Sequence, residues 1–66
     1  MANHPLREYR DQHEITLQDM ARKADTTAGS LSRIETWQQT PSLALVARLI
    51  KASRGALSAD DFLERA

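Results

Sequence analysis

The sequence contains no cysteine, and it has no long run of consecutive apolar residues. Without cysteine there is no disulfide framework and no zinc site with thiolate ligands, so packing alone must form the core. A helix that crosses a bilayer needs roughly 20 apolar residues, and a signal peptide needs an apolar segment that the start MANHPLREYR lacks. We therefore expect a soluble intracellular protein.

Residues that break helices are also scarce, with two prolines and two glycines among 66 residues. The segments between them have the cap residues and apolar spacing of short helices, and none favours a strand. A chain of this length holds one domain at most, and it buries only about 60% of its unfolded surface. The sequence predicts an all-α fold of five short helices in a single domain over residues 1–66.

Charge of one sign is not in excess, because nine basic residues balance nine acidic ones. Affinity for phosphate comes from concentrated lysine and arginine, so this balance argues against a strong non-specific polyanion binder. The charges are nevertheless segregated along the chain. Residues 43–54 carry three basic side chains and no acidic one, whereas the acidic side chains prevail over residues 55–66.

The first helix is predicted over about 5–13, with Pro5 at its first position. Thr16, followed by Asp19, is a start signal for a second helix over about 17–24. Its inward positions by periodicity are small or apolar: Met20, Ala21 and Ala24.

A third helix is predicted over 28–35, where Thr27 can cap the first turn. Its apolar positions Leu31 and Ile34 are three apart and therefore share a buried face. The outward positions are then Ala28, Gly29, Ser32 and Arg33.

Ser42 opens the fourth and strongest helix, which Gly55 is expected to end. The buried face is predicted to hold Leu43, Val46, Leu49 and Ile50, with Leu17 and Leu45 on outward faces. The motif SADD at 58–61 is a capping box that opens a short fifth helix with Phe62 and Leu63.

Two short helices joined by a three- or four-residue turn form a helix-turn-helix unit, here at about 16–35. In such a unit the second helix fits the major groove of DNA, and its outward side chains meet base edges.

Four segments resemble the phage repressor and Cro-like (XRE-type) helix-turn-helix proteins: LREYR at 6–10, ITLQDMARKA at 15–24, SLSRIE at 30–35 and PSLALVARLIKA at 41–52. The resemblance covers nearly the whole chain. It implies a compact lambda-repressor-like domain that regulates phage or bacterial transcription. The implied partners are double-stranded DNA, at a roughly palindromic operator, and a second copy of the chain, and the implied location is the bacterial cytoplasm or nucleoid.

The resemblance also implies roles for individual residues. Arg10 and Glu35 match a structural ion pair between the first and third helices. The positions that match DNA contacts are Thr16 and Gln18 for phosphate, Thr27, Ala28, Gly29, Ser32 and Arg33 for the groove, and the loop Trp37, Gln38, Gln39 and Thr40 for the backbone.

Three positions depart from the family pattern, which usually has glycine where this chain has Glu14, Asp25 and Trp37. Aspartate tolerates the left-handed backbone conformation and tryptophan does so poorly, so we expect the loop after the third helix to take a different path. Leu17 stands where the family has a phosphate-binding glutamine, with Gln18 one place later.

Other readings of these side chains remain open. Arg33 can contact guanine O6 and N7 or a phosphate, and Trp37 can contact DNA or cover the core. His4 and His13 lack a third ligand at metal spacing and are expected to be solvated. No catalytic constellation is present, so we expect no enzyme, no cofactor, no metal and no small-molecule substrate.

Two hypotheses follow. The first is a sequence-specific DNA-binding regulator of the Cro or repressor kind that binds as a dimer. The second is a protein-interaction module such as an antitoxin or an inhibitor of a host protein, which zero net charge and Leu17 favour. The apolar residues of the tail are possible dimer contacts: Leu57, Phe62 and Leu63.

Overall fold

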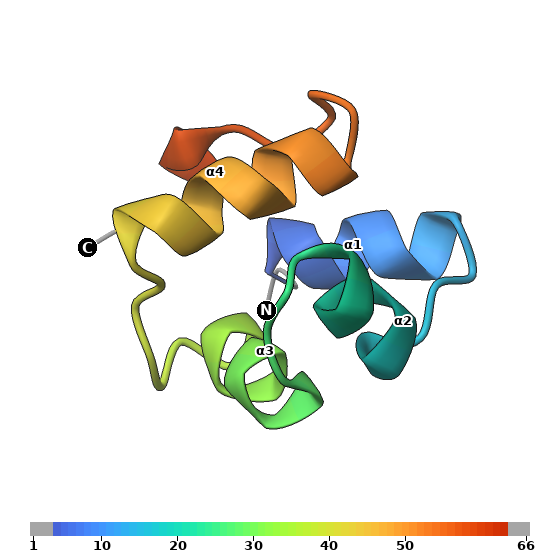
Figure 1. The fold of residues 1–66 in the computed structure, drawn as a ribbon, viewed down its shortest axis with the longest axis horizontal. Coiled ribbons are helices and arrows are strands. Elements are labelled where there is room, and N and C mark those ends of the chain that lie inside the picture. The colour runs from blue at the N-terminus through green and yellow to red at the C-terminus, as the bar shows by residue number, and fades with distance from the viewer. Residues whose placement is uncertain (1–3, 64–66) are drawn as a thin grey trace.

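The computed structural model describes residues 4–63. Over this range the chain forms α1 (Pro5–Gln12), α2 (Leu17–Lys23), α3 (Ala28–Glu35), α4 (Leu43–Ala52) and the 3-10 helix η1 (Ala59–Phe62), and it contains no strand (Figure 1). The all-α prediction is confirmed for these residues. The prediction of five α-helices is wrong, because the last element is a single 3-10 turn.

The α-helices begin at the cap residues that the sequence indicated. The hydroxyls of Thr16, Thr27 and Ser42 each accept a hydrogen bond from the amide three residues later, at 3.1 Å. Each bond satisfies one of the amides that have no partner inside a helix. Pro5 occupies the first turn of α1, where an amide hydrogen is not needed.

All four α-helices end in the same way. The residue after each C-cap has a positive φ: 53° at Glu14, 55° at Asp25, 63° at Trp37 and 55° at Arg54. The next amide then donates to the carbonyl five residues back, at 2.8 to 3.0 Å, which closes the helix end. Trp37 therefore does adopt the left-handed conformation, contrary to our expectation. Gly55 was expected to end α4, but the left-handed residue that directly follows the C-cap Ser53 is Arg54, and Gly55 comes one residue later.

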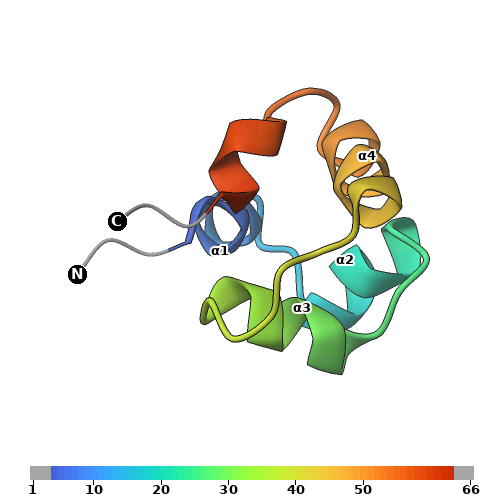
Figure 2. The ribbon, with the colours of Figure 1, turned by 90° about the vertical axis from the view of Figure 1, so that its left-hand side faces the viewer.

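The core lies where the five elements meet. Its most deeply buried side chains come from every α-helix: Leu6, Met20, Leu31, Ile34 and Leu49. Helix α2 packs against α3 and α4, while η1 packs against α1 and α4. Figures 1 and 2 agree that α4 and η1 lie at one end of the domain and α3 at the other. The outer face of α3 is therefore uncovered.

Helix α4 buries Val46 and Leu49 as predicted, and Ile50 packs against the core, but Leu45 is buried in place of Leu43. Leu45 is only 6% exposed, whereas Leu43 is 83% exposed. Leu43 is three residues before Val46 and Leu45 is four residues before Leu49, so helical spacing allows either leucine to be buried. The tertiary packing of α4, which contacts both α2 and η1, leaves Leu45 buried and Leu43 exposed. Leu17 also packs against the core instead of facing outward.

The tail residues have different surroundings from one another. Leu57 and Phe62 are 3% and 4% exposed and belong to the core of the chain, so their surfaces are not available to a second copy. Of the three possible dimer contacts, only Leu63 is exposed. No helix in the part of the chain described by the structure is long and apolar enough to cross a membrane.

Candidate nucleic-acid interface

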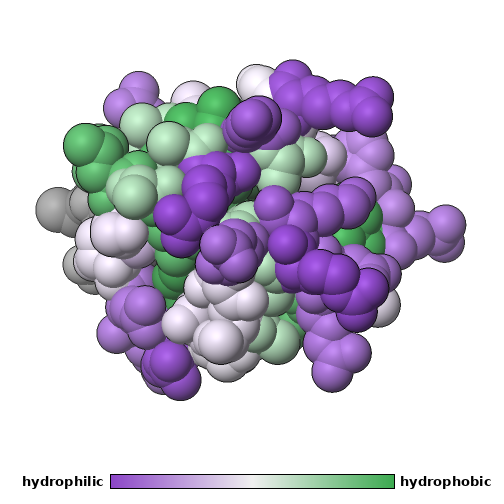
Figure 3. Space-filling view, in the orientation of Figure 1, coloured by the Kyte–Doolittle hydropathy of each residue, from purple (hydrophilic) through white to green (hydrophobic). Residues whose placement is uncertain are grey.

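The uncovered face of α3 is made of small side chains and one arginine. Because Leu31 and Ile34 are buried, Gly29, Ser32 and Arg33 are exposed and Ala28 is half-buried. Figure 3 shows pale surface over α3, between the strongly hydrophilic areas beside it. A helix with such short side chains lets its backbone approach a partner surface closely.

Arg33 is tied to the loop that follows α3. Its Nε–H donates to the side-chain carbonyl of Gln39 over 3.0 Å, and its main-chain carbonyl accepts from the Gln38 amide over 2.8 Å. The terminal nitrogens of the guanidinium are not used in this bond. They can form the pair of parallel hydrogen bonds by which arginine recognises guanine or a phosphate.

The N-cap threonines of α2 and α3 each have a hydroxyl hydrogen that is free to donate. Thr16 and Thr27 are exposed, and their oxygens accept the capping bonds of α2 and α3. A hydroxyl that accepts in this way still carries its own hydrogen, which can be donated to a phosphate. Gln18 is exposed beside Thr16. All three residues are therefore on the surface, Thr16 and Gln18 at the start of α2 and Thr27 at the start of α3.

Acidic side chains limit the positive potential of this region. Asp19, in the first turn of α2, lies 4.0 Å from the Arg22 guanidinium in an exposed pair. Asp25 occupies the turn itself and is exposed. Arg33 is the single basic side chain on α3. Any DNA contact made here must therefore depend on hydrogen bonding and shape more than on concentrated charge.

Arg10 fixes α3 against the rest of the domain. Its Nε and one terminal nitrogen donate to the two carboxylate oxygens of Glu35, at 2.7 and 2.8 Å, and its other terminal nitrogen donates to the Ile15 carbonyl at 3.0 Å. The two side chains are 12% and 7% exposed. The hydrogen bonds to Glu35 raise the pKa of the Arg10 guanidinium, although burial lowers it in part. Three segments thus meet at one guanidinium.

His4 is buried, which corrects the expectation of a solvated residue. It is 3% exposed, and its Nδ1 accepts the Leu6 amide hydrogen at 3.0 Å as the N-cap of α1. Its ring lies 4.4 Å from Trp37 and 5.6 Å from Phe62 between ring centroids. Burial lowers the pKa of the imidazole, while Glu35 and Asp61 raise it in part.

Trp37 therefore covers the core at the end of α3, with its indole against the His4 ring. It remains 41% exposed, so one face of the ring is open to solvent. The cover role and a contact to DNA do not exclude each other. His13 is exposed and packs on Tyr9, 4.5 Å between ring centroids. Among residues 4–63, no three acidic or histidine side chains gather as metal ligands would.

Arg48 has a positioning role that the sequence did not reveal. Its Nε–H donates to the Ala24 carbonyl over 2.7 Å, which connects α4 to the turn between α2 and α3. Ala24 is the C-cap of α2, so this carbonyl has no partner inside the helix. No spacing rule relates two residues 24 apart. Only the packing of α4 on α2 brings them together.

Of the comparisons with known proteins, the one with protein families gives a match, and it agrees with the helix-turn-helix arrangement of α2 and α3. No curated protein matches the chain, and no solved structure matches it. A family model described as a helix-turn-helix domain matches residues 4–60, which is most of the chain and includes α1 to α4. The chain therefore belongs to this family of helix-turn-helix domains.

Proposed function

We propose that the protein is a sequence-specific DNA-binding regulator of transcription, of the Cro or repressor kind, in which α3 enters the major groove. The observation that carries this proposal is the exposed face of α3, where Arg33 is held by Gln39 beside a surface of small side chains. A helix of this kind fits the groove closely and presents one side chain with two parallel donors.

The contacts fall into two groups. We assign the contacts in the groove to Thr27, Ala28, Gly29, Ser32 and Arg33. Phosphate contacts are assigned to residues at the start of α2 and in the loop after α3: Thr16, Gln18, Trp37, Gln38 and Gln39. With so few polar side chains on α3, the width and deformability of the DNA carry part of the selection.

We further propose that the protein binds a palindromic site as a homodimer. Leu43 at the start of α4 and Leu63 after η1 are 83% and 60% exposed, and η1 packs on α4. Figure 3 shows hydrophobic surface beside the start of α4. To read a palindromic site, such a pair must present its two α3 helices about 34 Å apart, which is one turn of DNA.

Selection from a random duplex library tests the proposal. The wild-type protein is expected to enrich one palindromic motif at physiological salt. Arg33→Gln is expected to weaken binding and to relax selection at one base pair in each half-site, a change of about 1 to 3 kcal/mol. Lys51→Gln removes the same charge from the exposed side of α4 and serves as the matched control. If no motif is enriched, sequence-specific binding is excluded.

A protein-interaction module is the second candidate, and the zero net charge of the chain favours it. Purification of the tagged chain from a bacterial lysate treated with nuclease distinguishes this candidate from the DNA-binding regulator. A stoichiometric protein partner that is lost in Arg33→Gln, together with no enriched DNA motif, would support this alternative. Recovery of the chain alone, with an enriched motif, supports the regulator.

A further inference from the structure

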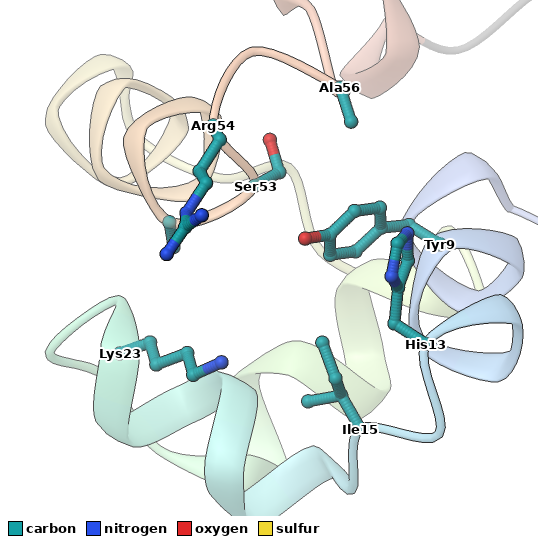
Figure 4. A pocket seen from close by; sticks show the side chains of 8 residues that line it. Tyr9, His13, Ile15, Lys23, Ser53, Arg54 and Ala56 are labelled. Atoms are coloured by element: carbon teal, nitrogen blue, oxygen red, sulfur yellow. The ribbon is translucent and has the colours of Figure 1, made fainter.

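A cavity of about 500 Å³ lies between the C-terminal ends of α1, α2 and α4. No lining residue comes from α3 or from the loop that follows it, so this cavity is distinct from the candidate DNA surface. Figure 4 shows Arg54 and Lys23 on one side and the Tyr9 hydroxyl opposite them, all directed into the open space. Three elements therefore bring polar groups to one point.

The polar groups of the cavity favour an anion. Its lining includes two cationic side chains, Lys23 and Arg54, and no acidic one. Neither cation takes part in an ion pair found among residues 4–63. Glu14 lies next to two lining residues in the chain, but it does not line the cavity. Two unpaired positive charges that face one space attract an anion there and repel each other without it.

The helix ends do not require these cations. The last carbonyls of α4 accept hydrogen bonds from the amides of Arg54 and Gly55, both at 3.0 Å. In α2 the Ala24 carbonyl is satisfied by Arg48. A lysine or arginine at a helix end often serves to satisfy such carbonyls. Here the backbone and Arg48 already do so, which leaves Lys23 and Arg54 available to a ligand.

The remaining walls suit a flat apolar group. Tyr9 and His13 form an aromatic pair, 4.5 Å between ring centroids, and Ile15 lies beside them on the same side of the open space (Figure 4). Ser53 is not a ligand group, because its hydroxyl already donates to the Ile50 carbonyl and accepts from the Leu57 amide. Small-molecule sites typically have volumes of roughly 300 to 1,000 Å³, and this cavity lies within that range, with a lining that is more polar than apolar.

We propose that this cavity binds a small organic anion that joins one carboxylate to a flat apolar ring. The carboxylate lies between Lys23 and Arg54, with the Tyr9 hydroxyl as a further donor, and the ring lies against Tyr9, His13 and Ile15. This proposal does not rest on DNA binding, and its test uses no DNA.

Titration of the full chain, followed by amide NMR shifts, tests the proposal with benzoate as the probe. We expect saturable shifts at Ile15, Lys23 and the segment 52–56, with a dissociation constant on the order of 1 mM. Benzyl alcohol, which has the ring without the charge, and inorganic phosphate, which has the charge without the ring, should each bind at least about tenfold more weakly. Equal binding of benzyl alcohol would overturn the assignment, and so would equal binding of phosphate.

Single-charge variants locate the anion. Lys23→Gln and Arg54→Gln are each expected to weaken benzoate binding about tenfold or more. Arg22→Gln removes a neighbouring cation of α2 that does not line the cavity and should leave binding unchanged. The melting temperature of each variant reports its folding. If benzoate gives no saturable shifts, or if all three variants bind it alike, the cavity is not an anion site.

Discussion

The Nε–H of Arg33 donates to the side-chain carbonyl of Gln39 over 3.0 Å, from α3 to the loop that follows it. Gln39 therefore orients the guanidinium, in addition to any contact of its own. Gln39→Ala should leave the free energy of unfolding within about 0.5 kcal/mol of wild type, because the bond is exposed. It should weaken DNA binding about fivefold, which corresponds to about 1 kcal/mol.

A double-mutant cycle with Arg33→Ala separates orientation from direct contact. If Gln39 also acts through Arg33, then Gln39→Ala should weaken binding less once Arg33 has been removed than it does in the wild-type protein. Additive losses measured by fluorescence anisotropy would show that Gln39 contacts DNA by itself and does not position Arg33.

We expect that removing one partner of the Arg10–Glu35 pair destabilises the fold, whereas replacing both partners with apolar residues does not. Arg10→Met leaves the largely buried Glu35 carboxylate without its partner and should cost about 3 to 5 kcal/mol. Arg10→Met combined with Glu35→Leu should recover most of this loss, because no buried charge remains. Urea denaturation followed by circular dichroism measures both. A double variant as unstable as the single one would contradict this account.

Stability should fall as the pH drops below about 6.5, the ordinary pKa of histidine. Burial lowers the pKa of His4 in the folded state, so in this range the unfolded chain takes up a proton that the folded chain resists. The proton would also go to Nδ1, which accepts the capping bond from the Leu6 amide. His4 therefore contributes stability above pH 6.5 that is lost as the pH falls through its folded-state pKa.

His4→Asn is the control for this pH dependence, since asparagine also caps a helix and does not titrate. The difference in unfolding free energy between wild type and His4→Asn should shrink from pH 7.5 to pH 5. A constant difference over this range would show that His4 does not titrate differently on folding.

Trp37 combines a favourable contact with an unfavourable backbone conformation. Trp37→Ala loses the contact with His4 and keeps a non-glycine residue at φ 63°. Trp37→Gly loses the same contact but removes the steric conflict. The glycine variant should therefore be more stable than the alanine variant by about 1 kcal/mol, measured by thermal unfolding. The opposite order would mean that the backbone at this position is not strained.

Gly29 lies inside α3, where a Cβ would meet only Arg33, at 3.6 Å from a terminal nitrogen. Gly29→Ala should therefore raise the free energy of unfolding by about 0.5 to 1 kcal/mol. If α3 approaches DNA as closely as we propose, the same change should weaken binding. Ser32→Ala, on the same exposed face, controls for loss of a hydroxyl. Unchanged affinity of Gly29→Ala would place the DNA farther from this position.

Local chemistry made much of the fold predictable. Caps at Thr16, Thr27 and Ser42 depend on the residue and on the amide three positions later, so they can be recognised without knowing the tertiary structure. The buried positions of α2 and α3 could be inferred because polar residues surround them. The outer face of α3, which carries the candidate site, follows from the burial of Leu31 and Ile34.

Choices made by tertiary contacts were not predictable from local sequence. Leu43 and Leu45 are chemically identical, and only the packing of α4 in the folded chain leaves one buried and the other exposed. His4 resembled a solvated terminal residue, but Trp37 and Phe62 cover it from distant parts of the chain. The bonds from Arg33 to Gln39 and from Arg48 to Ala24 depend on the path of a loop and on helix packing.

The shared helix ending has a consequence for how such chains can diverge. Carboxylate, indole and guanidinium side chains all occupy the left-handed position, at Glu14, Asp25, Trp37 and Arg54. The same pair of backbone hydrogen bonds therefore closes each helix whichever of these side chains is present, and a non-glycine residue is accepted there despite its steric cost. Relatives of this chain are better sought by the spacing between helices than by conserved glycines at the corners.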